Sequence, residues 1–185
     1  MIQDVTFTVR LSPNRKRWLA PDGNTTTEEA EAARFTLRAS LTRRDEIVVT
    51  RRCHDLAGGL AAWCDIETAI MQQRRKLRTK YEEEGEIKPP HEGADEAVVT
   101  AYEVALGKAS IADESSEAAQ CRSLEELLSG INFIARWPLR VVDVPKGWED
   151  LAERSVPDPV FWAIQGAMFE AMVEVVTGKT QPSEP

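Results

Sequence analysis

Cysteine and histidine side chains are the groups in this chain that could hold a metal ion or supply a nucleophile. Cys53 and His54 are adjacent, Cys64 follows eleven residues later, and His91 and Cys121 lie further along. Zinc ligands usually come in pairs a few residues apart, and a second such pair completes the site. On a straight helix Cys53 and Cys64 would lie about 16 Å apart, too far for one ion. The spacing therefore predicts no metal site and no cofactor, with two buried cysteines and a surface histidine.

Neither nucleophilic nor acid–base catalysis has a clear set of residues. A Cys/His nucleophile pair needs side chains within about 3 Å of each other, and nothing in the spacing supports that. The carboxylates of Asp113/Glu114 and Glu149/Asp150 are adjacent and lack apolar surroundings, which is typical of caps and surface charges. Residues 178–180 read Gly-Lys-Thr but lack the upstream glycine and following helix of a phosphate-binding loop. We expect no catalytic residues and no enzymatic activity.

Charge is distributed unevenly along the 185 residues, which carry a formal net charge of −8. Residues 1–52 hold 10 basic and 7 acidic side chains, whereas residues 91–185 hold 7 basic and 17 acidic ones. An acidic C-terminal half disfavours nucleic acid, which requires cations at its phosphates. The basic run 74–80 is followed by three glutamates, so it is interpreted as a solvated helix face. No apolar run is long enough for a membrane span, no signal peptide is predicted, and three widely spaced cysteines favour a reducing compartment.

Alternating residues predict two strands near the N-terminus, over 5–11 and 35–39, that pair with each other. A turn at 21–24 and a short helix over 27–31 lie between them. Residues 46–52 stay open, because Ile47-Val48-Val49-Thr50 favours a strand whereas Thr42 with Asp45 favours a helix start. Apolar spacing then predicts a helix over most of 53–83, bent or broken at Gly58-Gly59.

The second half of the chain is predicted to be helical with polar connections. Residues 82–95 are rich in Glu, Pro and Gly and predict a mobile linker. A helix is expected over about 95–106 and a polar loop over 107–118. Ser123 with Glu126 predicts the start of a further helix, which bends or ends near Pro138. Residues 141–144 are expected to be extended or an irregular helix end.

The terminal helix carries the clearest signal in the chain. Asp158 suits its N-cap, Pro159 its first turn and Gly178 its C-terminal cap. Apolar residues lie almost all round it, which is typical of a helix that is buried or bound to a partner. The stripe predicted to face the core consists of Phe161, Ile164, Met168, Met172 and Val175. The residues predicted to bind a partner are Trp162, Phe169 and Val173, together with Trp148.

These elements predict a mainly α (α+β) fold, with a helical domain and a small N-terminal β-hairpin or short sheet. The predicted parts are a β-element with a long helix over 1–81, a mobile acidic linker over 82–95, a helical module over 96–178 and a polar tail over 179–185.

Three segments, read in order, carry a resemblance to a known class of protein. They are Phe133-Ile134-Ala135-Arg136-Trp137, Gly147-Trp148-Glu149-Asp150-Leu151 and Val156-Pro157-Asp158-Pro159-Val160-Phe161-Trp162-Ala163-Ile164. Their layout resembles that of tail assembly chaperones of long-tailed bacteriophages, over some 120 residues and without an invariant motif. The front half, with 35–38 and 41–46 leading into helices, is similar as well. The insert at 82–95 and the loop at 107–118 depart from that layout.

The resemblance implies a non-enzymatic protein of the host cytoplasm that binds tape-measure and tail-tube proteins and leaves before the particle is finished. Whether a longer, frameshifted product exists stays open. A homo-oligomer stays open. Two alternatives remain from other classes: a structural connector or adaptor subunit of a phage-like particle, and a small metal-binding or regulatory protein using Cys53, His54 and Cys64.

Overall fold

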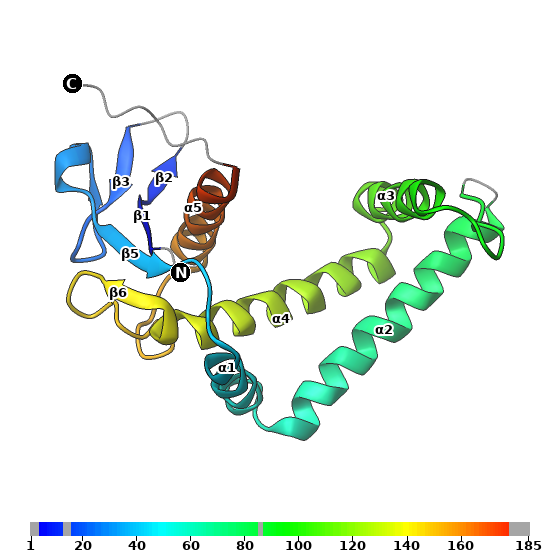
Figure 1. The fold of residues 1–185 in the computed structure, drawn as a ribbon, viewed down its shortest axis with the longest axis horizontal. Helices are drawn as coiled ribbons and strands as arrows, with labels where there is room; N and C mark the ends of the chain where they lie inside the picture. Colours follow the sequence, from blue (N-terminus) through cyan, green and yellow to red (C-terminus); the bar gives the residue numbers. More distant parts are fainter. Residues whose placement is uncertain (1–3, 13–15, 85–86, 178–185) are drawn as a thin grey trace. The chain divides into compact units, whose positions relative to one another are not determined.

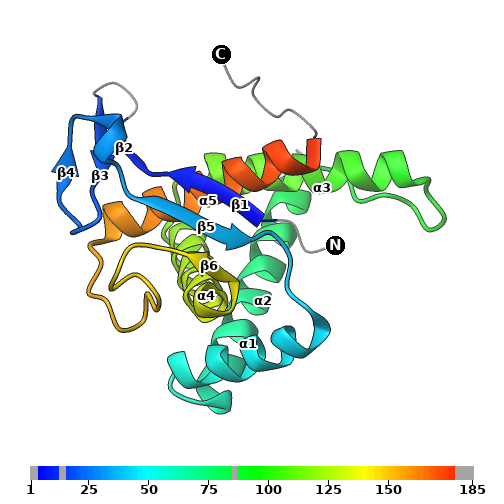
Figure 2. The same ribbon diagram turned by 60° about the vertical axis from the view of Figure 1, so that its left-hand side comes forward.

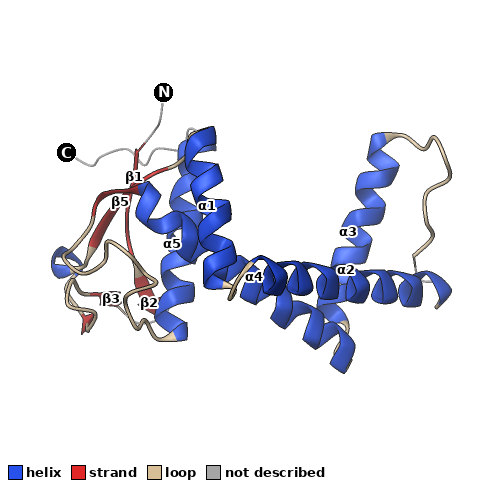
Figure 3. Cartoon of the chain, turned by 90° about the horizontal axis from the view of Figure 1, so that it is seen from below, coloured by secondary structure: helices blue, strands red, loops and turns tan. Residues whose placement is uncertain are grey.

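A computed structural model describes residues 4–12, 16–84 and 87–177, and its contacts divide the chain into two compact units. Unit 1 combines Met1–Cys53 with Asn132–Pro185, and unit 2 is the intervening stretch His54–Ile131. The strands of the described residues all belong to unit 1, and unit 2 is built from helices and their connections (Figure 3). The fold is mainly α with small antiparallel sheets, as predicted.

Two three-stranded sheets form the β-part of unit 1. The first has the order β1-β5-β6, from Asp4–Thr8, Arg34–Arg38 and Val141–Asp143. The pairing predicted from the sequence is confirmed, since β1 and β5 are antiparallel. The second has the order β2-β3-β4, and its strands are Arg10–Ser12, Arg17–Leu19 and Thr25–Thr26.

The hydrophobic core of unit 1 lies on one face of the first sheet. Val5 and Phe7 of β1 and Phe35 and Leu37 of β5 are buried, because strand side chains alternate between the two faces. The opposite face is polar, and the Thr6 and Thr36 hydroxyls lie 3.0 Å apart on it. Helix α5 (Asp158–Thr177) runs alongside β1 (Figures 1 and 2). The core is completed by helical and loop residues Phe133, Trp137, Trp148, Leu151, Ile164 and Met168.

The open question at residues 46–52 is settled in favour of a helix. Helix α1 spans Arg43–Leu56 and begins with a capping box. The Asp45 N–H donates to Thr42 Oγ1 at 3.2 Å, and the Thr42 N–H donates to Asp45 Oδ2 at 3.0 Å. This cap, together with burial of Val49 and Cys53 one helical turn apart, outweighs the β-propensity of the segment.

Glycines end the first helix where the sequence placed a bend or break. Gly58 and Gly59 have φ of 91° and 118°, which no helix can continue, and α2 (Leu60–Glu83) starts directly after them. Helix α3 spans Glu96–Ala112, and the Asp95 side chain caps it by accepting from the Val98 N–H at 2.9 Å.

Two boundaries in this half of the chain were predicted wrongly. The loop expected over 107–118 is helical up to Ala112 and again from Ser116, where α4 (Ser116–Arg140) begins. Ser123 is interior to α4 and starts no helix. The Ser115 hydroxyl, which accepts from the Ala118 N–H at 3.3 Å, takes the capping position instead. Helix α4 does end close to Pro138, and a short 3₁₀ helix, Glu29–Glu31, occupies the predicted segment 27–31.

Unit 2 has a core of its own that includes part of the predicted linker. Ile87 is 8% exposed and packs with residues from three helices. The buried residues of this cluster are Leu77, Tyr81, Ile87, Ala118 and Cys121. The unit boundaries near residues 53 and 131 differ from those predicted at 81 and 95, because composition does not reveal that distant ends of a chain share one core.

Helix α5 starts one residue earlier than its capping pattern suggests. The Pro157 carbonyl accepts from the N–H groups of Val160 and Phe161, so Pro157 is the N-cap and Asp158 and Pro159 form the first turn. Asp158 is therefore inside the first turn, where its carboxylate suits the helix dipole. The predicted C-terminal cap, Gly178, lies outside the described residues.

Candidate functional site

One face of α5 is fixed in the core of unit 1, as predicted. Ile164 is 0% and Met168 8% exposed, and both belong to the buried cluster. Phe161, Met172 and Val175 are partly buried and pack against the same cluster. The predicted inner stripe is therefore confirmed, and α5 packs against the core of unit 1 along this side.

The other face of α5 exposes large apolar side chains. Trp162 is 42%, Phe169 63% and Val173 42% exposed. Gly166 lies between them, and the space where a side chain on it would stand is open. We call these four residues the outer stripe. Their spacing of four, three and four residues places them in one line along the helix, like the seam of a coiled coil.

Acidic residues border the outer stripe. The charged side chains of α5 are Asp158, Glu170 and Glu174, and the helix contains neither lysine nor arginine. Glu170 and Glu174 also line a hollow of about 450 Å³ between α5 and the sheet. Its remaining lining residues are Thr6, Phe7, Thr8, Glu29, Arg34, Ala167 and Ala171. The described residues thus contribute three carboxylates and one guanidinium to the lining of the hollow.

Trp148 is buried, so it does not belong with the residues that were predicted to bind a partner. It is 1% exposed, and its Nε1 donates to the Pro21 carbonyl at 2.8 Å. Its own carbonyl accepts from Trp137 Nε1 at 2.6 Å, and the Arg154 guanidinium lies 3.8 Å from its ring centroid. The aromatic ring therefore anchors the loop that leads into α5, and it cannot contact a partner.

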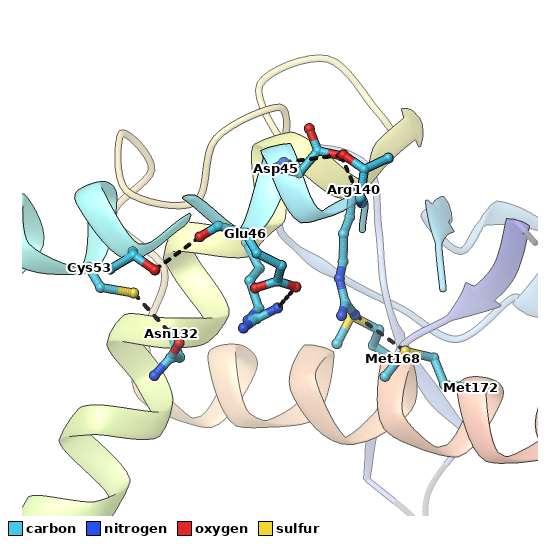
Figure 4. Close-up of polar contacts among 10 residues, drawn as sticks. Asp45, Glu46, Cys53, Asn132, Arg140, Met168 and Met172 are labelled. Atoms are coloured by element: carbon cyan, nitrogen blue, oxygen red, sulfur yellow. Dashed lines mark hydrogen bonds and ion pairs between the residues drawn. The ribbon is translucent and has the colours of Figure 1, made fainter. Parts of the chain in front are cut away.

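Arg140 supports the inner side of α5 from the end of α4. Its guanidinium lies over two methionine sulfurs, with Nη1 at 3.9 Å from Met168 Sδ and 3.3 Å from Met172 Sδ (Figure 4). Burial lowers the pKa of this guanidinium from its usual value, and the nearby cation of Arg136 lowers it further. Arg136 itself is paired with Glu46 at 2.6 Å. These contacts join α1, α4 and α5 around one core.

The cysteines are structural or solvent-exposed thiols. Cys53 is buried, and its Sγ lies 3.6 Å from Asn132 Oδ1 (Figure 4). Burial raises the pKa of the Cys53 thiol, so it is a poor nucleophile. Cys121 is also buried, but Cys64 is exposed, contrary to the prediction of a buried pair at 53 and 64. Among the residues that the structure describes, no three His, Cys, Asp or Glu side chains gather as a metal site.

The basic run over 74–80 is engaged in ion pairs within unit 2. Arg74 pairs with Glu125 at 2.6 Å, and Arg78 pairs with Glu103 at 3.0 Å. Lys80 pairs with Asp113 at 2.8 Å. Partial neutralisation of this kind weakens the attraction for phosphates, in keeping with the interpretation of the run as a solvated helix face.

Comparison of the chain with models of known families, with curated proteins and with solved structures found no match. None of the helices in the described part of the chain is long and apolar enough to cross a membrane.

Proposed function

We propose that this chain is a non-enzymatic, protein-binding factor that uses the outer stripe of α5 to hold its partner. The observation that carries the proposal is Phe169, which is 63% exposed on a helix whose opposite face packs against the core of unit 1. Exposed aromatic side chains on a rigid element are typical anchors of protein interfaces, because they bury much area and lose little entropy. Trp162 supplies a second aromatic anchor two helical turns away.

Within this class we propose a tail assembly chaperone of a long-tailed bacteriophage, acting in the host cytoplasm on tape-measure and tail-tube proteins. The support is the sequence layout described above, in which two resembling segments now have physical roles. The segment 147–151 places Trp148 and Leu151 in the core, and 156–164 leads into the exposed stripe. A binding surface held out on a stable core is what a transient carrier of other proteins needs.

The test is co-expression of the chain with a tape-measure protein, the partner that the resemblance implies, followed by affinity purification. We expect the unaltered chain to retain that protein and the Phe169→Asp variant to lose it. Met71→Asp is a matched control, since Met71 is also 63% exposed but lies on α2 of unit 2. Equal retention by all three chains would contradict the proposed binding face.

Particle composition separates the chaperone from the runner-up, a connector or adaptor subunit. A chaperone leaves before completion, so mass spectrometry of purified particles should detect the tail-tube protein without this chain. Stoichiometric presence of the chain in finished particles would replace the chaperone proposal by the connector one.

A further inference from the structure

We propose that the partner segment bound by the outer stripe is an amphipathic α-helix whose apolar residues are flanked by lysine or arginine. This inference rests on the proposed function, because it names the chemistry of the partner that the same face of α5 would hold. It follows from two independent features, the spacing of the stripe and the charge beside it.

The spacing favours a helical partner. Trp162, Gly166, Phe169 and Val173 repeat at alternating intervals of four and three, which keeps them in one narrow seam over three turns. A narrow, straight seam of this kind can pack against the apolar stripe of a second helix. Gly166 leaves an open site between two aromatic residues, where an apolar side chain of the partner could insert. A partner helix can therefore pack with knobs in holes along the whole stripe.

The charge favours a basic partner. Every charged side chain of α5 is acidic, and two of them, Glu170 and Glu174, reach the hollow beside the seam. Among the described residues that line this hollow, Glu29, Glu170 and Glu174 supply three carboxylates and Arg34 supplies one guanidinium. A cationic side chain flanking the partner's apolar stripe would meet favourable potential there, whereas an acidic one would be repelled.

The same charges disfavour a second copy of this chain as the occupant. Two α5 helices packed through their outer stripes would bring only acidic side chains along the seam, with no lysine or arginine on either helix to compensate. Like charges beside a helical seam are the usual means of discouraging self-pairing. The seam is therefore suited to a partner of opposite charge.

Binding of three synthetic 21-residue helical peptides tests the proposal. All three have heptad repeats, with defined residues along the apolar seam and at the positions that flank it, and alanine elsewhere. One carries leucine along the seam with flanking lysine, the second leucine with flanking glutamate, and the third serine with flanking lysine. Fluorescence anisotropy of the labelled peptides against the full chain should show binding of the leucine–lysine peptide at least tenfold tighter than of the other two.

Variants assign the binding to the stripe and its acidic border. The double variant Glu170→Lys/Glu174→Lys should lose at least tenfold in affinity for the leucine–lysine peptide and gain affinity for the leucine–glutamate peptide. Glu67→Lys/Glu126→Lys makes the same change of net charge at exposed positions of unit 2 and should leave the preference intact. Phe169→Asp should abolish binding of both leucine peptides.

Three outcomes would overturn the inference. They are equal binding of the two leucine peptides, equal loss in both double variants, and a concentration-dependent dimer of the free chain that Phe169→Asp dissolves. The last result would identify a second copy as the occupant. A clear preference for the leucine–lysine peptide, combined with presence of the chain in finished particles, would retain this inference and reject the chaperone proposal.

Discussion

Truncating one residue on each side of α5 should separate its two roles. Ile164 is 0% exposed, so Ile164→Ala removes packed atoms and leaves a cavity that costs about 2–5 kcal/mol of unfolding free energy. Phe169 is 63% exposed, so only about a third of the roughly 1.5–3 kcal/mol available from burying it is used in the free chain. Phe169→Ala should therefore lower stability by less than about 1 kcal/mol.

In the complex the order of the two effects reverses. Partner binding would bury the remaining two thirds of Phe169, so Phe169→Ala should weaken association by about 1–2 kcal/mol, or roughly 5- to 30-fold. Urea unfolding followed by circular dichroism measures the first quantity, and peptide anisotropy measures the second. Equal losses of stability in both variants would refute the reasoning, because they would show that both faces of α5 are packed.

Ile164 is a better probe of the inner face than Met168. An aspartate at Met168 would stand near the Arg140 guanidinium, whose Nη1 is 3.9 Å from the methionine sulfur. The new carboxylate would be paired, so Met168→Asp would understate the cost of burying a charge there. Ile164 has no such partner among its core neighbours, which are apolar.

Three further predictions concern the rest of the chain. Exposed Cys64 should react with a thiol reagent much faster than buried Cys53, and elemental analysis of the purified chain should find less than stoichiometric zinc; protection of Cys64 together with one tightly held ion would contradict this. A hydrogen bond from Lys80 holds the pKa of Asp113 well below its usual value, so its contribution to stability is complete above about pH 5 and is lost as the pH falls toward the lowered pKa; Asp113→Asn should flatten the acid side of the stability profile, and an unchanged profile would exclude this source. Because Ile87 is buried, Ile87→Ser should accelerate cleavage of segment 82–95 by a glutamate-specific protease. An unchanged cleavage rate would show that Ile87 does not restrain the segment, which would then be mobile as its composition predicts.

Local patterns were sufficient for much of the fold. Alternation located the strands that became β1 and β5, and Gly58-Gly59 marked the end of α1. The two faces of α5 could be predicted from helical periodicity alone. Consecutive residues are rotated by about 100° around the helix axis, and this rotation separates the apolar residues into a core side and an outer side. The capping pair Thr42 and Asp45 contained the answer for α1, although the β-branched run beside it argued for a strand.

Features that depend on distant contacts were beyond the sequence patterns. Tryptophan is a common interface residue, but Trp148 is buried in the core of unit 1, where its Nε1 donates to the carbonyl of Pro21, more than a hundred residues earlier. The partition into units likewise reflects the packing of Phe35 against Trp137, at 5.7 Å between ring centroids. The wrongly predicted start of α4 has a different cause. Ser123 and Ser115 can both cap a helix through their hydroxyls, but only at Ser115 is the residue three positions later, Ala118, buried.

Site-specific photocrosslinking tests the central claim most directly. Benzoylphenylalanine would replace Phe169 in one chain and Met71 in another, in cells that also produce the tape-measure and tail-tube proteins proposed as partners. Both positions are 63% exposed, so accessibility is matched. We expect a crosslink from position 169 to the tape-measure protein and none from position 71. Absence of that crosslink at 169, or the same crosslink from both positions, would contradict the claim that the outer stripe of α5 is the partner-binding face.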